Sequence, residues 1–491
     1  MEQLKIEKNI EGPLKFERFI IIVICLAAAI RVFIFCAAFP FFNNVDEQSH
    51  FDLVLKYSKG HFPKRALEKF DPESAEIIAE NGSPEFLNDA NSAATAQEKK
   101  WIAEQFSNIN NRETWSWPSY YFLAGIWCRA GKAIGWTSGH LLYWIRFLNV
   151  PIMAALVWVS YLIGRRFFSD NPQCRIAVPV LTAFFPQDFF YGITSDALSP
   201  LVFAISFYML LEIYLGEKSW RYHLLAGLFA TVTLLTKASN NAIVLLSFVV
   251  ILFKIKKVVS EKRFKNYAPS LAAFCLASMI PIVLWLLHNY YVLGDLIGAA
   301  ATMKERGWTK KSFDQFFNHP ILTWKGLAFF LGELTRTYWR GEFTWKMNRM
   351  AVPAMDIFYL LSSGIFLAAA IWAFLFKSKA NKPVSFVFFG GFFVIAASIL
   401  FLAYSSMRLD FGECVYPSRS EPYFTSGRLM AGTIVPFIIL YIYGLRYILS
   451  KLKLASFTLL IIIVIGAGIT ISEIAITLPA FYSAFNWYHL K

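Results

Sequence analysis

Apolar runs recur along nearly the whole chain, and they constrain the fold more than any other feature. Each run holds about 20 residues, the length that a helix needs to cross about 30 Å of hydrocarbon. Hydrophobic residues make up 57% of the chain and charged residues only 16%, whereas about a quarter of a soluble domain is charged. The sequence therefore predicts an all-α polytopic membrane protein.

Hydropathy predicts about eleven transmembrane helices. The first, residues 17–39, is longer than the apolar core of a signal peptide and has no clear small-residue cleavage site after it, so we expect it to be retained. The others are expected at residues 141–164, 174–191, 194–215, 222–237, 240–257, 269–291, 354–376, 384–404, 429–449 and 454–478.

The charged loops predict the orientation, because short basic loops of membrane proteins lie on the cytoplasmic side. If the N-terminus is cytoplasmic and the spans alternate, every short basic loop lies inside and the C-terminus lies outside. These inner loops hold Arg165, Arg166 and Arg175; Lys218 and Arg221; Lys254, Lys256, Lys257, Lys262, Arg263 and Lys265; Lys377, Lys379 and Lys382; and Arg446, Lys451 and Lys453.

We expect residues 1–491 to form a single integral membrane domain. A large outer loop at 40–140 follows the first span, a six-span core occupies 141–291, and four C-terminal spans lie within 354–478. Residues 292–353 and 405–428 form two further outer loops. The fairly apolar run 117–136 is predicted to lie in the outer interface as a juxtamembrane helix, because counting it as a span would invert every later loop.

The net charge of +14 does not indicate a nucleic-acid partner, because the Lys and Arg residues lie mostly in short loops between apolar runs. The six cysteines are scattered without metal-ligand spacing, and the chain has no phosphate-binding glycine loop and no HExxH motif. We therefore expect a lipid bilayer as the surroundings of the protein, with no nucleic acid and no dedicated metal site.

Candidate acidic residues collect at the outer ends of the spans rather than at mid-membrane, where a transporter would be expected to place ionisable groups. Asp46, Glu47 and His50 follow the first span, and Asp46 and His50 are four residues apart, so they share one helix face. Asp196 lies in a very short loop between two spans. A carboxylate at the lip of a cavity can accept a proton from an incoming hydroxyl. For both aspartates, a simple helix N-cap is an equally good interpretation.

Basic residues on the outer side are few, and as a group they suit a phosphate at the membrane surface. Lys237 lies in a tight outer hairpin, Arg336 and Arg340 lie in the loop 292–353, and Arg428 ends the last outer segment. Arg31 lies inside the first span, where it must be paired or face a polar cavity. For any one of them, an ion pair with a nearby carboxylate is the better interpretation.

Five short motifs follow one another along nearly the whole chain. They are Val45-Asp46-Glu47-Gln48-Ser49-His50, Trp117-Pro118-Ser119-Tyr120-Tyr121, Arg146 with Gly164-Arg165-Arg166, Ser195-Asp196, and Ser426-Gly427-Arg428. With these motifs in this order, the chain resembles the C-type (GT-C) superfamily of membrane glycosyltransferases. The likeness is to the family 39-like bacterial enzymes, such as the protein O-mannosyltransferases and the aminoarabinose lipid A transferases.

The resemblance implies a GT-C fold and transfer of a sugar from a polyprenyl-phosphate carrier to an acceptor hydroxyl on the outer face, with inversion. It implies that Asp46 is the base and that Glu47 and Asp196 position it or the acceptor. The carrier phosphate would be bound by Lys237, Arg336, Arg340 and Arg428. Arg31 and His50 are further candidates for binding the substrate or its phosphate, because of their places in and directly after the first span. No cofactor is expected to be required, although Asp46 and Asp196 could share a divalent metal.

The resemblance leaves the acceptor open between a glycan, a lipid and a protein. Gln48, Trp117 and Leu429 depart from the residues that many relatives have at these places. The compact loops favour a bacterial inner membrane and a role in the cell envelope. Two alternatives remain: a flippase or transporter of lipid-linked glycans, and a glycan polymerase or ligase that uses lipid-diphosphate glycans and depends on outer Arg and His residues more than on Asp46.

Overall fold

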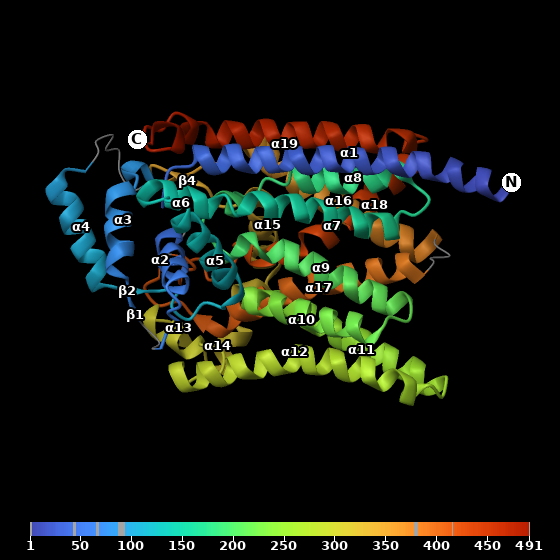
Figure 1. Ribbon diagram of the computed structural model, residues 1–491, viewed down its shortest axis with the longest axis horizontal. Coiled ribbons are helices and arrows are strands. Elements are labelled where there is room, and N and C mark those ends of the chain that lie inside the picture. Colours follow the sequence, from blue (N-terminus) through green and yellow to red (C-terminus); the bar gives the residue numbers. More distant parts are fainter. Residues whose placement is uncertain are drawn as a thin grey trace.

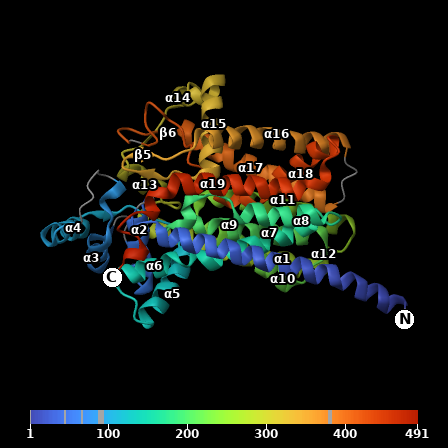
Figure 2. The same ribbon diagram turned by 90° about the horizontal axis from the view of Figure 1, so that it is seen from above.

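The computed structural model describes residues 2–42, 46–64, 68–86, 94–377, 382–414 and 416–490. Its long helices run side by side along one axis, which is horizontal in Figure 1. The N-terminus and the C-terminus lie at opposite ends of this bundle (Figures 1 and 2). The bundle comprises α1 (Glu2–Ala38), α7 (Asn149–Phe167), α8 (Pro172–Ala183), α9 (Ser199–Leu215), α10 (Trp220–Thr236), α11 (Asn241–Ser260), α12 (Phe264–Leu293), α16 (Pro353–Lys377), α17 (Lys382–Arg408), α18 (Ile434–Lys451) and α19 (Thr458–Phe481).

Eight helical stretches of the described chain are long and apolar enough to cross a membrane, which confirms the expected all-α polytopic class. Their bounds are Phe16–Ala38, Ser138–Phe167, Ser195–Leu215, Phe264–Leu293, Pro353–Phe376, Lys382–Arg408, Gly427–Lys451 and Ala455–Phe481. The expected spans 222–237 and 240–257 form α10 and α11, which are not among the eight. The number of eleven crossings therefore stays a prediction.

The expected helix 174–191 is interrupted, which corrects the sequence analysis. Helix α8 begins where the side chain of Asn171 accepts a hydrogen bond from the Cys174 amide, and it ends at Ala183. Pro186 has no amide hydrogen to donate and cannot continue a helix, so the chain resumes only as a 3-10 turn, η2 (Asp188–Tyr191). The break frees the carbonyls of Ala183 and Phe185, and Arg31 of α1 donates to both, at 3.1 and 3.4 Å.

Shorter helices gather at the end of the bundle where α1 stops. In Figure 1, α2 (Glu47–Ser58), α3 (Pro72–Asn81) and α4 (Ala96–Asn108) lie across the direction of the long helices. The expected juxtamembrane helix 117–136 is α5 (Ser119–Ala133), which packs against α2 and leads through α6 (Ser138–Arg146) into α7. Phe51, Tyr120 and Leu142, with neighbours from the same helices, form a second apolar core beneath this end.

The loop 292–353 also folds at this end, as α13 (Ala299–Glu305), α14 (Phe313–Phe317) and α15 (Trp324–Arg340). Figure 2 shows α15 crossing the direction of α16 and α17. Three antiparallel two-residue strand pairs tie the loops together: β1 (Glu68–Lys69) with β2 (Asn110–Asn111), β3 (Thr309–Lys310) with β6 (Leu409–Asp410), and β4 (Thr344–Trp345) with β5 (Asn348–Arg349). The β3–β6 pair joins the two later loops to each other.

Basic loops meet at the other end of the bundle. Arg175 pairs with Glu17 at 2.8 Å, and Arg166 and Lys218 pair with Glu212 at 2.6 and 2.7 Å. The first contact joins the start of the first candidate span to the first turn of α8, and the other two join the end of α7 and the loop after α9 to the end of α9. The two ends of the bundle therefore differ in chemistry: one carries paired basic loops, and the other carries the cross-lying helices.

Candidate active site

A cavity of about 530 Å³ lies among the cross-lying helices and loops. Its lining comes from all three segments that the sequence analysis assigned to the outer side, 40–140, 292–353 and 405–428, and from the helix ends near Ser195 and Lys237. Its charged lining residues are the carboxylates Asp46, Glu113 and Glu342 and the cations Lys237, Arg306, Arg349 and Arg428.

Asp46 stands immediately before α2 but does not cap it with its side chain. Its backbone is left-handed, with φ 63° and ψ 14°, and no side-chain capping hydrogen bond is made. This conformation is unfavourable for a residue other than glycine, by about 1–2 kcal/mol. The side chain is 29% exposed and lines the cavity. Asp46 therefore occupies the N-cap position without capping the helix through its side chain, and its carboxylate faces the cavity.

Glu47 is inaccessible, and it holds the chain next to Asp46. Its side chain is fully buried and pairs with Arg146, whose Nε and Nη2 each donate to one carboxylate oxygen at 2.7 Å. The amides of Phe42 and Ile193 donate to the same carboxylate at 2.9 Å. A carboxylate enclosed in this way cannot touch a substrate, so its place in the site is to position Asp46.

Arg428 bridges two carboxylates that come from distant parts of the chain. Its Nη2 lies 4.0 Å from Oδ2 of Asp46, and its Nη1 lies 3.7 Å from Oδ2 of Asp196. The other oxygen of Asp196 pairs with Lys237. Asp196 is 1% exposed, whereas Lys237 and Arg428 are 22% and 24% exposed. The two cations thus remain partly open to the cavity while the carboxylate between them is closed off.

The Nε–H of Arg428 is buried and has no hydrogen-bond partner among the described residues. A buried donor without an acceptor is costly, and such groups usually find a partner in a ligand or an ordered water. This donor and the exposed part of Lys237 make the cavity wall suited to an anion.

His50 also lines the cavity, although it is only 5% exposed. Its Nδ1 lies 2.6 Å from the hydroxyl of Tyr121, and its Nε2 lies 3.5 Å from the hydroxyl of Thr194. Asp46, just before α2, and His50, in its first turn, therefore line the same space, and α5 holds the imidazole in place.

Arg31 does not reach the cavity. It is buried within the bundle, where its Nε donates to Glu473 of α19 at 3.1 Å and its Nη2 donates to the hydroxyl of Tyr191 at 2.6 Å. Every cation inside a membrane-spanning segment needs such compensation. The contacts of Arg31 join α1, α19 and the break after α8, so we do not retain it as a phosphate ligand.

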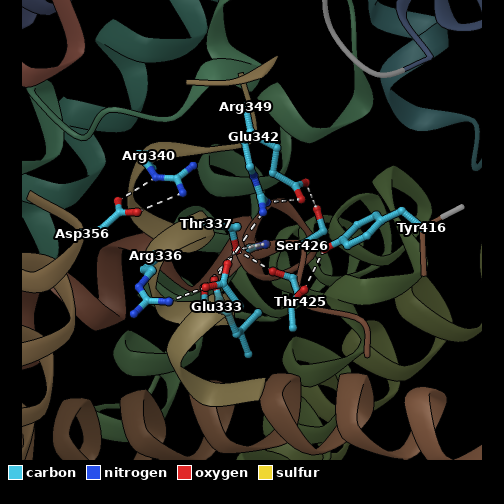
Figure 3. Close-up of polar contacts among 12 residues, drawn as sticks. Glu333, Arg336, Thr337, Arg340, Glu342, Arg349, Asp356, Tyr416, Thr425 and Ser426 are labelled. Carbon is cyan, nitrogen blue, oxygen red and sulfur yellow. Dashed lines mark hydrogen bonds and ion pairs between the residues drawn. The ribbon is translucent and has the colours of Figure 1, made fainter. Parts of the chain in front are cut away.

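Arg336 and Arg340 also lie outside the cavity lining. Figure 3 shows each of them turned toward a carboxylate: Arg336 pairs with Glu333, which Arg349 also contacts at 3.7 Å, and Arg340 contacts Asp356 through Nε at 2.7 Å and Nη2 at 3.1 Å. Their charges are therefore used within the protein. The phosphate role that the resemblance implies for them has no support in this geometry.

Four charged lining residues escaped the sequence analysis: Glu113, Arg306, Glu342 and Arg349. The β4–β5 hairpin turns at Lys346 and Met347, both with positive φ, and brings Arg349 to within 3.1 Å of Glu342. Glu342 in turn accepts a hydrogen bond from Ser426 (Figure 3). All four lie in the predicted outer loops, but no motif distinguishes them from the other charged residues there.

Tyr416 contributes a hydroxyl to the same wall. Burial raises the pKa of this phenol to about 12, and the nearby carboxylate of Glu342 acts in the same direction. The hydroxyl therefore stays protonated and can donate a hydrogen bond; it lies 2.7 Å from that of Thr425 (Figure 3).

The carboxylates of the cavity do not form a metal site. Within the described residues, no group of three or more His, Cys, Asp or Glu side chains could hold a metal ion. Asp46 and Asp196, the pair that the sequence analysis offered as shared ligands, both face the guanidinium of Arg428. A divalent cation between them would meet that positive charge, so the arrangement does not fit one.

Fold and site together define a multi-pass helical membrane protein with a charged cavity at one end of its bundle. The chain belongs to the family of predicted membrane proteins DUF2142, whose model matches residues 30–415. No curated protein matches the chain.

Several solved structures are similar to the chain at low sequence identity. The oligosaccharyltransferase of Archaeoglobus fulgidus, in complex with zinc and sulfate, has a TM-score of 0.42 at 14% identity over 94% of this chain and 53% of its own. The archaeal oligosaccharyltransferase AglB of the same organism, with an inhibitory peptide and a dolichol-phosphate, has 0.42 at 12% over 94% and 56%. The arabinosyltransferase EmbB of Mycobacterium smegmatis has 0.40 at 10% over 81% and 30%. The chain thus spans about half the length of the two archaeal proteins, and less of the third.

Proposed function

We propose that this protein is a membrane glycosyltransferase of the GT-C fold that moves a sugar from a polyprenyl-phosphate carrier to an acceptor hydroxyl. One observation carries the proposal. The carboxylate of Asp46 makes no capping hydrogen bond and faces a cavity in which Arg428 and Lys237 lie close by. A base and a phosphate-binding pair thus share one space at the end of an apolar bundle.

The proposed reaction is a single displacement. Asp46 accepts the proton of the acceptor hydroxyl, and the oxygen attacks the anomeric carbon on the face opposite the phosphate. The bond between that carbon and the phosphate oxygen breaks as the new glycosidic bond forms, so the configuration inverts. Lys237 and Arg428 stabilise the charge of the departing polyprenyl phosphate. Glu47 and Arg146 keep Asp46 in place, and Asp196 orients the two cations.

The proposed location of the reaction is the outer face of a bacterial plasma membrane, with the N-terminus in the cytoplasm. Support comes from the distribution of charge between the two ends of the bundle. The loops that carry Arg166, Arg175 and Lys218 meet at the end opposite the cavity. Basic loops remain cytoplasmic, which would place the cavity outside.

The test is sugar transfer from a panel of radiolabelled polyprenyl-phospho-sugars into membrane acceptors, with the wild-type chain and with Asp46→Asn. We expect transfer by the wild type and a loss of 100-fold or more in the variant, the usual scale of a general base. Asp314→Asn is the matched control, because Asp314 is exposed and outside the cavity lining. Transfer that survives Asp46→Asn at equal expression would remove Asp46 as the base.

A second candidate is a glycan polymerase or ligase that uses lipid-diphosphate glycans. The presence of Arg306, Arg349 and His50 in the cavity favours it, because a diphosphate needs more cationic contacts than a monophosphate. A comparison of monophosphate and diphosphate donors in the same assay distinguishes the two candidate functions. Transfer from the diphosphate donor alone, unaffected by Asp46→Asn, would select the ligase.

A further inference from the structure

Arg306 differs from the other cations of the cavity because it has no carboxylate partner. Lys237 pairs with Asp196, Arg428 lies between Asp46 and Asp196, and Arg349 pairs with Glu342. Among the described residues, Arg306 forms no ion pair. Its Nε–H is buried and without a hydrogen-bond partner. The charge of Arg306 is therefore uncompensated within the described chain.

Trp308 presents a second unpartnered donor beside it. The residue is 8% exposed and lines the cavity, and its indole Nε1–H has no hydrogen-bond partner among the described residues. The indole is held edge-on between Phe411 and Phe424, at centroid distances of 5.3 and 5.7 Å. The guanidinium of Arg306 lies over the indole, 5.2 Å from its centroid. Packing thus fixes both donors before any ligand arrives.

We propose that Arg306 and Trp308 form a second anion-binding site, which takes a carboxylate or phosphate group carried by the acceptor. This inference rests on the proposed function, in which Lys237 and Arg428 hold the phosphate of the donor. Arg306 and Trp308 come from the loop after α12, whereas Lys237 lies at the end of α10 and Arg428 in η6 (Gly427–Thr433). The two sites are therefore built from different segments of the chain.

The charge of Arg306 favours an anionic acceptor over a neutral one. A neutral sugar hydroxyl can satisfy one donor, but it leaves the charge of Arg306 without compensation. A carboxylate or phosphate accepts from the guanidinium and from the indole at once, and charge-assisted bonds of this kind are about twice as strong as neutral ones. The site would thus select acceptors by charge while Asp46 acts on their hydroxyl.

Binding of soluble acceptor mimics tests the site without requiring transfer. The full chain is reconstituted in lipid nanodiscs and titrated with methyl glucuronide, methyl glucoside 6-phosphate and neutral methyl glucoside. We expect the wild type to bind at least one anionic probe about tenfold or more tightly than the neutral probe. The tighter of the two anionic probes identifies the group as a carboxylate or a phosphate.

Three variants locate the binding. Arg306→Gln is expected to remove the preference for the anionic probe. Trp308→Phe, which keeps an aromatic ring at this place but removes the indole N–H, is expected to reduce the preference several-fold. Arg419→Gln is the matched control, since Arg419 is exposed and pairs with Asp410 outside this cavity, and it should bind like the wild type. Trp308→Phe also serves if Arg306→Gln folds poorly, because an aromatic ring remains beside Phe411 and Phe424 and the charge of Arg306 is kept.

A preference that persists in both Arg306→Gln and Trp308→Phe would overturn the proposal, and so would equal wild-type binding of the three probes. A preference lost in Lys237→Met but kept in Arg306→Gln would place the anion at the donor site instead. Failure of the proposed function gives a different result. In that case no polyprenyl-phospho-sugar serves as donor, while the probe preference still depends on Arg306.

Discussion

The guanidinium of Arg146 and the carboxylate of Glu47 lie face to face at 2.7 Å through two parallel contacts, 99 residues apart in the chain. Arg146 is 1% exposed and Glu47 is fully buried. Arg146 also donates to the carbonyl of Pro40 at 2.9 Å. The pair therefore fastens the chain at Pro40, before Asp46, and at Glu47, directly after it, and the position of the proposed base depends on α6.

Arg146→Gln should destabilise the protein strongly, because it leaves the charge of Glu47 buried without its partner. We expect a loss of about 3–5 kcal/mol in the free energy of unfolding, the range for breaking a buried pair from one side. Denaturant unfolding of the purified chain in detergent measures it. Lys59→Gln is the control, because Lys59 is 38% exposed in its pair with Asp71 and should change stability by less than about 1 kcal/mol. Similar losses in both variants would contradict the assignment.

Asp46→Gly should abolish transfer without destabilising the fold. Glycine adopts a φ of 63° without the strain that aspartate carries there, and no capping bond is lost. We expect the free energy of unfolding to stay equal or to rise by up to about 1 kcal/mol. Asp46→Ala keeps a Cβ at this φ and should be less stable than Asp46→Gly. A marked loss of stability in Asp46→Gly would mean that the side chain supports the fold.

Lys237→Met should unfold more easily, because it leaves the buried Asp196 with Arg428 alone, 3.7 Å away. We expect a loss of several kcal/mol, most of which returns in the double variant Lys237→Met with Asp196→Leu, since an apolar pair can replace a buried ion pair. Donor KM should remain raised in the double variant because the phosphate contact is still missing. A double variant with wild-type donor KM would exclude Lys237 from donor binding.

Arg336→Gln and Arg340→Gln should leave the KM for the donor unchanged, because both side chains are committed to carboxylates outside the cavity (Figure 3). Their stabilities should differ. Arg340 is 7% exposed and its loss leaves Asp356 without this partner, whereas Arg336 is 32% exposed. Arg340→Gln should therefore lower the free energy of unfolding more than Arg336→Gln. Steady-state kinetics with varied donor and melting curves in detergent check both points. A donor KM raised several-fold in either variant would restore it as a phosphate ligand.

Part of the candidate site was predictable from the sequence. Asp46 and His50 were expected on one helix face, and both line the cavity, although Asp46 lies just before α2 with a left-handed backbone. Lys237 and Arg428 were chosen because cations are rare on the predicted outer side, and the structure brings both to Asp196. Pro186, near which helix α8 is interrupted, was also visible in the sequence. Hydropathy measures only how apolar a run is, so it predicted one continuous helix there.

The remaining assignments could not be made from spacing, because an arginine in a loop gives no sign of its partner. Arg340 ends α15 and Arg306 follows α13, yet Arg340 is paired with Asp356, whereas Arg306 has no carboxylate partner among the described residues. The resemblance implied a role for Arg340 and none for Arg306, so it favoured the residue that does not line the cavity.

The sequence was sufficient for the class of the protein and for the segments that gather at one end of it. The reason is that a helix crosses hydrocarbon only if its side chains are mostly apolar and its backbone groups are hydrogen-bonded within the helix. The charged residues therefore lie in the loops between the spans. Only the tertiary structure decided which charges neutralise each other and which remain for a ligand. Ion pairs such as Arg146 with Glu47 and Arg31 with Glu473 join residues far apart in the chain, and burial, which depends on the packing of every helix, determines which of them are closed to a substrate.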